Sequence, residues 1–288
     1  MKYAIEHESR LSFVEPVREH QCEVRLAPRE NEHQRVASLH LSTEPESAVS
    51  LYQDCFGNTV HFFDVTPPHR QLVTRLRSEV ETLLTNPFAF SPVPPPHEQR
   101  WLEHEVAQQP RLLDFVLHRS PHTPAIDRAA GFFADAPAYE GKDWLLESVV
   151  AARDWLADHI EYEAEAAEKR LPLQQVIERG SGDARDLAHA LVALVRAWNV
   201  PARYVAGYHD VSDEEDDPSP VHAWAEVLIP GAGWRGFDVV NRLVVNDFYV
   251  AVAAGRDADD TRPLKTVFKG EDPVDAPTVL LHFSRQEQ

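Results

Sequence analysis

The sequence predicts an α+β fold, in which an N-terminal antiparallel β-sandwich-like domain precedes a core with a buried helix packed on an antiparallel sheet. Three observations support this prediction. Apolar and polar residues alternate in short segments up to about residue 84, as they do in half-buried strands. A proline-rich segment follows, and beyond it apolar residues recur at helical spacing before strand-like segments return.

The N-terminal part has the pattern of strands separated by turns. Residues 22–26, 37–41 and 59–63 alternate in the manner of strands, and residues 56–58 form a Phe-Gly-Asn turn signal. Proline lacks the backbone N–H that a central strand or helix interior needs, so the proline-rich residues 91–96 predict a stiff linker.

The position of this linker defines the expected domains, because 288 residues are enough for two compact units. We expect an N-terminal β-domain at residues 1–90. A linker with the first helix should occupy residues 91–110, and the core should occupy residues 111–288.

Helices are expected in the first half of the core. Residues 101–118 and 144–162 have apolar side chains at helical spacing, and residues 172–178 predict a shorter helix. A further helix should begin after Ser181 or Asp183, either of which can cap its free amides. Its many apolar positions predict burial on most sides.

Strands follow this buried helix. Residues 203–208, 222–229 and 234–240 have strand patterns, and a Pro-Gly-Ala-Gly segment at residues 230–233 should join the last two. The acidic run at residues 213–217 is expected to be a solvated loop, because it lacks the ligand spacing of a calcium loop.

The charge of the chain excludes some partners. Its 47 acidic residues outnumber 28 basic ones, and the formal charge of -19 repels nucleic acid and anionic membrane surfaces. No segment approaches the roughly 20 apolar residues of a membrane span, and the N-terminus lacks an apolar leader. We therefore expect a cytoplasmic protein. Cys22 and Cys55 lack metal-ligand spacing and are interpreted as reduced structural thiols.

Three segments of the core together resemble a known family. In order and spacing, residues 182–189, 221–227 and 233–238 resemble the cysteine, histidine and aspartate blocks of the bacterial transglutaminase-like superfamily. The resemblance extends to residues 54–61, 202–208 and 255–270, and so to nearly the whole chain. A chance occurrence of these residue types in an unrelated α+β domain is therefore disfavoured.

The resemblance implies a papain-like core with a Cys-His-Asp triad. Such a triad attacks carboxamide or peptide bonds and transfers the acyl group to water or an amine, which includes protease, amidase and cross-linking activities. The corresponding positions here are Ala184 for the nucleophile, His222 and Asp238. No cofactor or metal is implied.

The chemistry of these residue types supports the assignment. A thiol in the first turn of a buried helix has a lowered pKa because the helix dipole favours the thiolate. A histidine pairs with it, and a carboxylate fixes the orientation of the imidazole. The methyl group of Ala184 can neither ionise nor attack, so the chain is predicted to be inactive in thiol chemistry, although a cysteine there would make it active. Ser181 is interpreted as a cap, and Cys22 and Cys55 belong to the other domain.

Two alternatives for the site remain open. A four-residue turn at residues 230–233 would place His222 opposite Asn241 and Ala225 opposite Asp238, so Asp238 needs a bulge or a different loop to reach the histidine. Asn241 is thus an alternative orienting group, although the resemblance favours Asp238.

A metal site is the other alternative. It would use Asp186, His189 and His222, but a histidine on an apolar helix is more often a hydrogen-bonded core residue. We therefore expect no metal.

The alanine at position 184 has two explanations. It is either an engineered replacement that leaves an inert scaffold, or the mark of a natural pseudoenzyme that binds a peptide or protein. The chain begins at Met1 and shows no tag, which favours the pseudoenzyme. The acidic run at residues 213–217 favours a cationic or amine-bearing partner.

Overall fold

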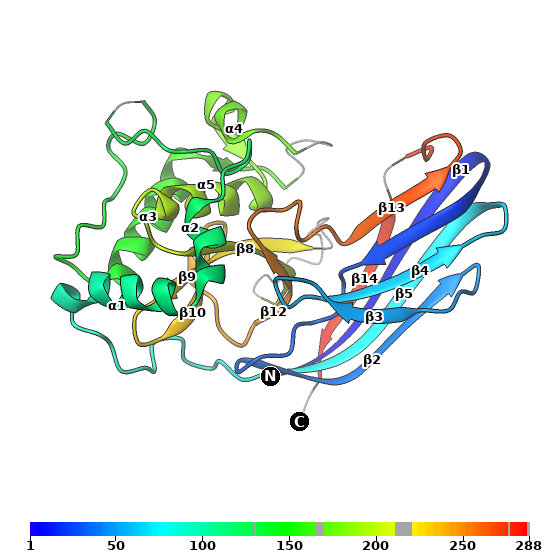
Figure 1. The fold of residues 1–288 in the computed structure, drawn as a ribbon, viewed down its shortest axis with the longest axis horizontal. Coiled ribbons are helices and arrows are strands. Elements are labelled where there is room, and N and C mark those ends of the chain that lie inside the picture. Colours follow the sequence, from blue (N-terminus) through cyan, green and yellow to red (C-terminus); the bar gives the residue numbers. More distant parts are fainter. Residues whose placement is uncertain (130, 165–169, 211–220, 276, 287–288) are drawn as a thin grey trace.

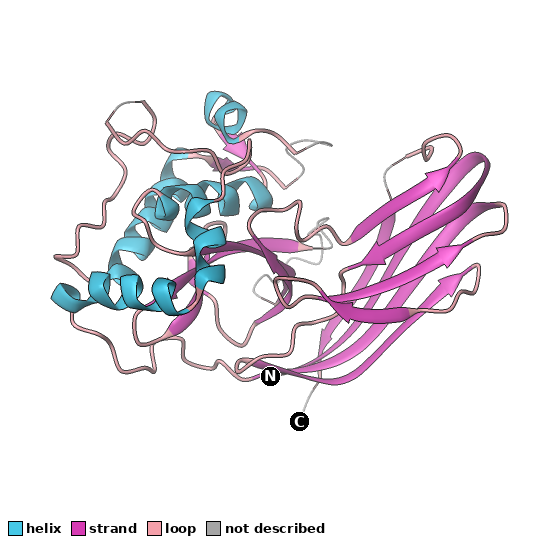
Figure 2. Ribbon diagram, viewed as in Figure 1, coloured by secondary structure: helices cyan, strands magenta, loops and turns pink. Residues whose placement is uncertain are grey.

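The computed structural model describes residues 1–129, 131–164, 170–210, 221–275 and 277–286. The acidic run at residues 213–217 lies outside the described residues. Figure 1 shows a domain of long strands beside a core that contains the helices, and Figure 2 shows the same division by type of element. The expected α+β fold is confirmed.

The N-terminal domain is one curled antiparallel sheet. Its strands follow the order β2-β5-β1-β4-β3, and their bounds are β1 Lys2–Val24, β2 Gln34–Glu44, β3 Ser50–Gln53, β4 Thr59–Val65 and β5 His69–Thr82. Apolar side chains that alternate along these strands fill the inside of the curl, among them Phe13, Phe63 and Leu76. The expected strands and the turn at residues 56–58 are present.

The end of the chain differs from the expected division. Strands β13 (Leu264–Lys269) and β14 (Thr278–Arg285) pair with β1, and thus complete the N-terminal sheet although we expected residues 111–288 to form the core. The reason is the length of β1, which spans 23 residues. Strand β5 pairs with the first part of β1 and strand β4 with its last part, each along one edge. The backbone N–H and C=O groups on the other edge of β1 remain unpaired until β13 and β14 return to it.

The helices lie in the core. They are α1 Pro95–Gln108, η1 Pro110–Leu113, α2 Asp114–Leu117, α3 Leu145–His159, α4 Leu173–Arg179 and α5 Ala184–Arg196. The single helix expected over residues 101–118 is divided into three pieces. Pro110 explains the break, since its ring cannot donate a hydrogen bond to the preceding turn.

Five strands form the core sheet, in the order β11-β10-β9-β8-β12. Their bounds are β8 Ala202–His209, β9 His222–Ile229, β10 Gly233–Asp238, β11 Leu243–Val244 and β12 Tyr249–Gly255. The short strands β6 (Glu161–Tyr162) and β7 (Ser181–Gly182) pair in parallel just before α5.

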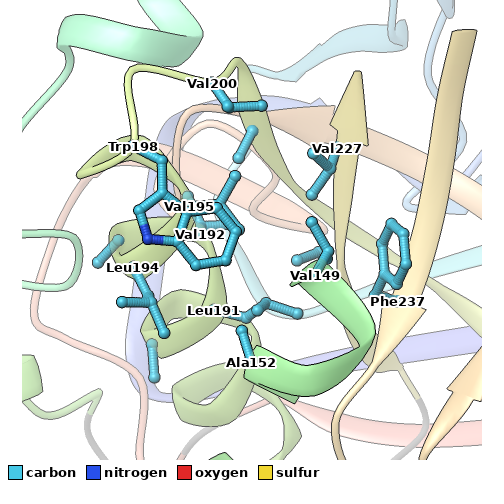
Figure 3. Packing of buried hydrophobic residues seen from close by; sticks show 14 of the residues in the cluster. Val149, Ala152, Leu191, Val192, Leu194, Val195, Trp198, Val200, Val227 and Phe237 are labelled. Atoms are coloured by element: carbon cyan, nitrogen blue, oxygen red, sulfur yellow. The ribbon is translucent and has the colours of Figure 1, made fainter. Parts of the chain in front are cut away.

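Helix α5 is buried on nearly all sides, as its sequence predicts. Figure 3 shows Leu191 and Val195 of α5 in one apolar cluster with Val149 of α3 and with Val227 and Phe237 of the sheet. Each such side chain contributes roughly 1.5–3 kcal/mol when it leaves water. This packing holds the start of α5 in place against the sheet.

The two parts of the molecule are joined along strand β12. The side-chain amide of Gln34 both donates to and accepts from the backbone of Ala251, and the amide of Asn58 does the same with Ala254. In the described residues, no helix is long and apolar enough to cross a membrane.

Candidate active site

Ala184 is the first residue of helix α5, and a capping box fixes this helix start. The Asp183 carboxylate accepts hydrogen bonds from the amides of Arg185 (2.9 Å) and Asp186 (3.1 Å), and the Asp186 carboxylate accepts one from the amide of Asp183 (3.3 Å). Of the two residues expected to cap the helix, Asp183 is the N-cap, whereas Ser181 lies in β7. Position 184 thus lies at the positive end of the helix dipole.

The methyl group of Ala184 packs among small residues of the neighbouring strands and is only 6% exposed. Its cluster includes Ala206 of β8 and Ala223 of β9, with Val221 and Val240 packed against the edge. Because Val221 and Ala223 flank His222 in sequence, this packing brings the helix start close to the start of β9.

His222 and Asp238 form a buried pair. The imidazole Nε2 lies 2.8 Å from the Asp238 carboxylate, and the two side chains are 3% and 0% exposed. An ionised carboxylate only accepts hydrogen bonds, so Nε2 carries the proton and Nδ1 of the neutral ring carries the lone pair. Within the described residues, Nδ1 has no hydrogen-bond partner. It is the ring nitrogen that remains for chemistry.

The register of the β9–β10 hairpin explains how the pair meets. Ile229 pairs with Gly233 and Ala225 pairs with Phe237, so residues 230–232 form the connection. The four-residue turn that would place Ala225 opposite Asp238 is therefore wrong by one residue. In the actual register Asp238 falls beside Trp224, on the same face as His222.

Two further side chains hold Asp238. Tyr249 donates to its Oδ2 at 2.8 Å and the Asn241 amide donates at 2.7 Å, while Oδ1 accepts from the amides of Val240 and Asn241. Burial raises the pKa of Asp238, but hydrogen bonds from His222, Asn241 and Tyr249 outweigh it and lower the pKa to about 2. Asn241 thus contacts the carboxylate, and Asp238 is the group that contacts the histidine.

Tyr249 was missed by sequence reasoning. It comes from β12, at the far edge of the sheet from β10, and no motif spacing marks it. Burial and the charge of Asp238 raise its pKa, so the phenol stays neutral and remains a donor. The available signal was a tyrosine 11 residues after Asp238, in the second strand beyond the aspartate block, and it was not specific.

Two of the three alternative metal ligands accept hydrogen bonds from backbone amides, and the third, His222, is paired with Asp238. His189 Nε2 accepts from the amide of Ala258 at 3.0 Å, and Asp186 belongs to the capping box. Burial and the neighbouring Asp183 raise the pKa of Asp186 to about 6. No cluster of three potential ligands occurs in the part of the chain that the structure describes.

The two cysteines belong to the N-terminal domain and are free thiols. Cys22 is buried in β1, where desolvation raises its pKa to about 12. Cys55 is exposed in the turn before β4. Neither belongs to the core elements that form the site around Ala184.

Comparison with known families agrees with this architecture. The bacterial transglutaminase-like N-terminal region matches residues 3–81, and the transglutaminase-like superfamily core matches residues 135–239. The chain belongs to the transglutaminase-like superfamily. The matched core contains Ala184, His222 and Asp238.

Relatives cover nearly the whole transglutaminase-like chain. An uncharacterized protein of Mycobacterium leprae is 27% identical over 263 residues, which are 90% of this chain and 90% of the relative. Another uncharacterized protein, from Mycobacterium tuberculosis H37Rv, is 28% identical over 289 aligned residues, which cover 92% of this chain and 87% of that relative. A solved structure, named a "putative cysteine protease" from Cytophaga hutchinsonii, has a TM-score of 0.66 and 20% identity over 100% of this chain and 91% of that one. This likeness shows the shared fold.

Proposed function

We propose that this chain is a pseudoenzyme of the transglutaminase-like superfamily, which binds a peptide or protein segment at the site of Ala184, His222 and Asp238 without cleaving or transferring it. The observation that supports the proposal is the buried His222–Asp238 pair, which is complete beside a helix start that bears alanine. The groups that would ionise and orient a thiol are present near position 184, where the residue is alanine.

The chemistry of the site explains why the protein would bind a peptide and why it would not cleave or transfer it. A thiol at position 184 would be ionised by the helix dipole and by His222, whose tautomer Asp238 fixes. The amide of residue 184 would then stabilise the oxyanion of a carbonyl under attack. A methyl group removes the nucleophile but leaves the groups that recognise a carboxamide or peptide bond.

The decisive experiment restores the sulfur. In an Ala184→Cys variant that also carries Cys22→Ala and Cys55→Ser, we expect the rate of alkylation to report a thiol pKa clearly below the ordinary value of about 8.5. Adding His222→Ala should remove most of that shift, because the ion pair would be lost. An ordinary thiol pKa, unaffected by His222→Ala, would mean that the site has decayed and would refute the triad assignment.

Binding is measured on the unaltered protein. Fluorescence anisotropy with labelled glutamine-containing peptides should detect a complex, and an assay for released ammonia should stay at background. The Ala184→Cys protein should bind similarly, and attack of its thiol on the glutamine carboxamide should form a thioester and release ammonia. If no peptide from a diverse set binds at about 100 μM, the binding role is excluded at useful affinity.

A further inference from the structure

Two histidine side chains lie against each other inside the N-terminal domain. His20 of β1 and His69 of β5 are both buried, and their rings stack with centroids 5.3 Å apart and planes inclined by 7°. They lie where β1 bends and β5 begins, and Figure 1 shows this tip of the domain away from the helices of the core. The pair is therefore independent of the proposed function.

Apolar side chains surround the pair. Phe13 makes T-shaped contacts with both imidazoles, at centroid distances of 5.7 Å from His20 and 6.3 Å from His69. Phe268 of β13 makes a further T-shaped contact with His20 at 5.1 Å, and Val65 lies opposite His20 in β4. These surroundings disfavour a charge on either ring.

Hydrogen bonds determine where the protons of the two rings lie. His69 Nδ1 lies 3.0 Å from the carbonyl oxygen of Pro67, and a carbonyl only accepts, so this nitrogen carries a proton. In the neutral ring Nε2 is then the acceptor, and it lies 3.0 Å from Nδ1 of His20. His20 therefore donates from Nδ1 and keeps its lone pair on Nε2. That Nε2 atom is buried and has no hydrogen-bond partner among the described residues.

An additional proton would find no acceptor in this arrangement. If His20 took it, Nε2 would become a buried N–H donor without an acceptor. If His69 took it at Nε2, two N–H groups would face each other unless the proton of His20 moved to its own Nε2, which gives the same unpaired donor. In either case a positive charge would remain in an apolar interior, and such a group either loses its proton or becomes exposed.

Neighbouring charges do not compensate for this proton in the part of the chain that the structure describes. The charged side chains of β1, β4, β5 and β13 at this tip are exposed, and they are Glu15, Arg18, Glu19, Asp64, Arg70 and Lys269. On the inner face, burial raises the pKa of Cys22 to about 12 and lowers the pKa of His61, so both side chains are neutral. Burial, and then the neighbouring His69, lower the pKa of His20 to about 4.

We propose that His20 and His69 make the tip of the N-terminal domain acid-sensitive: the tip stays closed while both imidazoles are neutral, and uptake of one proton opens it. Opening brings Nε2 of His20 to water, which supplies the missing acceptor. It also exposes Phe13 and Phe268. The opened tip thus presents an apolar surface in acid that is covered at neutral pH.

The first test locates the protons in the unaltered protein. Long-range ¹H–¹⁵N spectra of the histidine rings show which nitrogen is protonated, and we expect Nδ1–H on both His20 and His69 at pH 7. His20 should remain neutral until the pH falls below about 5, because its charged form requires an open tip. A proton on Nε2 of His20 at pH 7, or ionisation near the ordinary pKa of about 6.5, overturns the proposal.

The second test measures opening by hydrogen exchange of the amides at residues 20–22 and 63–65, which pair between β1 and β4. His20 should have the ordinary pKa of about 6.5 in the open form, whereas its pKa is about 4 in the closed form. The open form binds the proton more tightly, so stability against opening is lost as the pH falls from about 6.5 toward 4. Between pH 7 and pH 5 the protection of these amides should fall about twentyfold.

Variants assign this change to the pair. In His20→Phe/His69→Phe neither ring can take a proton, and protection of the same amides should fall less than about threefold between pH 7 and pH 5. His40→Phe is the matched control, because it removes an exposed imidazole of the same domain and should keep the full twentyfold change. A twentyfold change that persists in the double variant, or no change in the unaltered protein, overturns the proposal. If the double variant does not fold, the nitrogen spectra of the unaltered protein still decide.

Discussion

At the residue scale, Asp238 shows how a completely buried carboxylate stays ionised. Its two oxygens accept hydrogen bonds from His222, Tyr249 and the side chain and backbone of Asn241, in addition to the amide of Val240. Several donors to the charged form outweigh the cost of desolvation, which is why its pKa falls to about 2. The charge is therefore part of the fold as well as of the site.

This arrangement predicts a pH-dependent contribution to stability. The pKa of Asp238 is lower in the folded protein than the value of about 3.9 in the unfolded chain, so its stabilisation is complete above about pH 5 and is lost as the pH falls toward 2. An Asp238→Asn variant lacks this ionisation. The difference in unfolding free energy between the unaltered protein and this variant should shrink by about 1 kcal/mol between pH 7 and pH 3.

Urea unfolding monitored by tryptophan fluorescence at several pH values measures that difference. Asp158→Asn is the matched control, because Asp158 is an exposed carboxylate whose surface ion pair with Arg242 should contribute little to stability. A constant difference for Asp238→Asn across the pH range would contradict the lowered pKa.

His222 and its partner Asp238 could be recognised from the sequence, but the other side chains that bind Asp238 could not. His222 and Asp238 stand in blocks whose order and spacing are distinctive. Tyr249 joins them only because β12 and β10, which lie on opposite sides of β9 and β8, place their side chains against the same carboxylate. The role of Asn241 likewise depends on a local turn, in which its backbone and side chain both fold onto Asp238.

At the scale of elements, the hairpin between β9 and β10 decides which side chains meet. The amide of Ala232 donates to the carbonyl of Ile229 at 3.0 Å across Pro230 and Gly231, and both Gly231 and Gly233 adopt positive φ. Proline followed by a left-handed glycine suits a type II turn. The sequence contains this turn signal, but a pattern of alternation does not distinguish a three-residue from a four-residue connection, and one residue exchanges the two faces of a strand.

Gly207 of strand β8 lies where the core sheet leaves no room for a larger side chain. It pairs with His222 of β9, and a Cβ atom there would lie 2.2 Å from the carbonyl oxygen of Val250 and 2.6 Å from the Trp224 ring. Gly207→Ala should therefore force β8 and β12 apart and cost about 2–4 kcal/mol of unfolding free energy. Urea unfolding measures the loss, and near-ultraviolet circular dichroism should report a displaced Trp224.

The control for this variant is Gly180→Ala. Gly180 follows helix α4 with a φ of 75°, and an added Cβ would meet nothing within 4 Å. Only the strain of a left-handed alanine then applies, which is about 1 kcal/mol. If Gly207→Ala costs no more than Gly180→Ala, the close approach between β8 and β12 does not constrain the fold.

At the scale of the whole molecule, both ends of the chain complete the N-terminal sheet. The proline-rich linker indicated two units, and the alternating pattern indicated the type of the first unit. The return of β13 and β14 to β1 was not predicted, because an amphipathic strand near the C-terminus fits either sheet by its pattern alone. Long-range pairing depends on which backbone edges remain open, and that information lies in the assembled fold.

The junction between the two units depends on Asn58, which sequence reasoning placed only in a turn. Asn58 is completely buried, and its side-chain amide pairs with both backbone groups of Ala254, as a neighbouring strand would. Asn58→Ala should leave that N–H and carbonyl unpaired and cost about 2–4 kcal/mol. Hydrogen exchange should then accelerate at the amide of Ala254.

The comparison within β12 makes this prediction specific. The amide of Ala251 is held by Gln34 instead, so it should keep its slow exchange in Asn58→Ala and lose it in Gln34→Ala. Gln53→Ala, in the exposed strand β3 close to Asn58 in sequence, should change neither amide. Equal acceleration at both amides in Asn58→Ala would mean that β12 separates from the N-terminal domain as one unit. That result would contradict the expectation that Asn58 and Gln34 hold β12 independently. No acceleration at Ala254 would show that the Asn58 amide does not hold the junction.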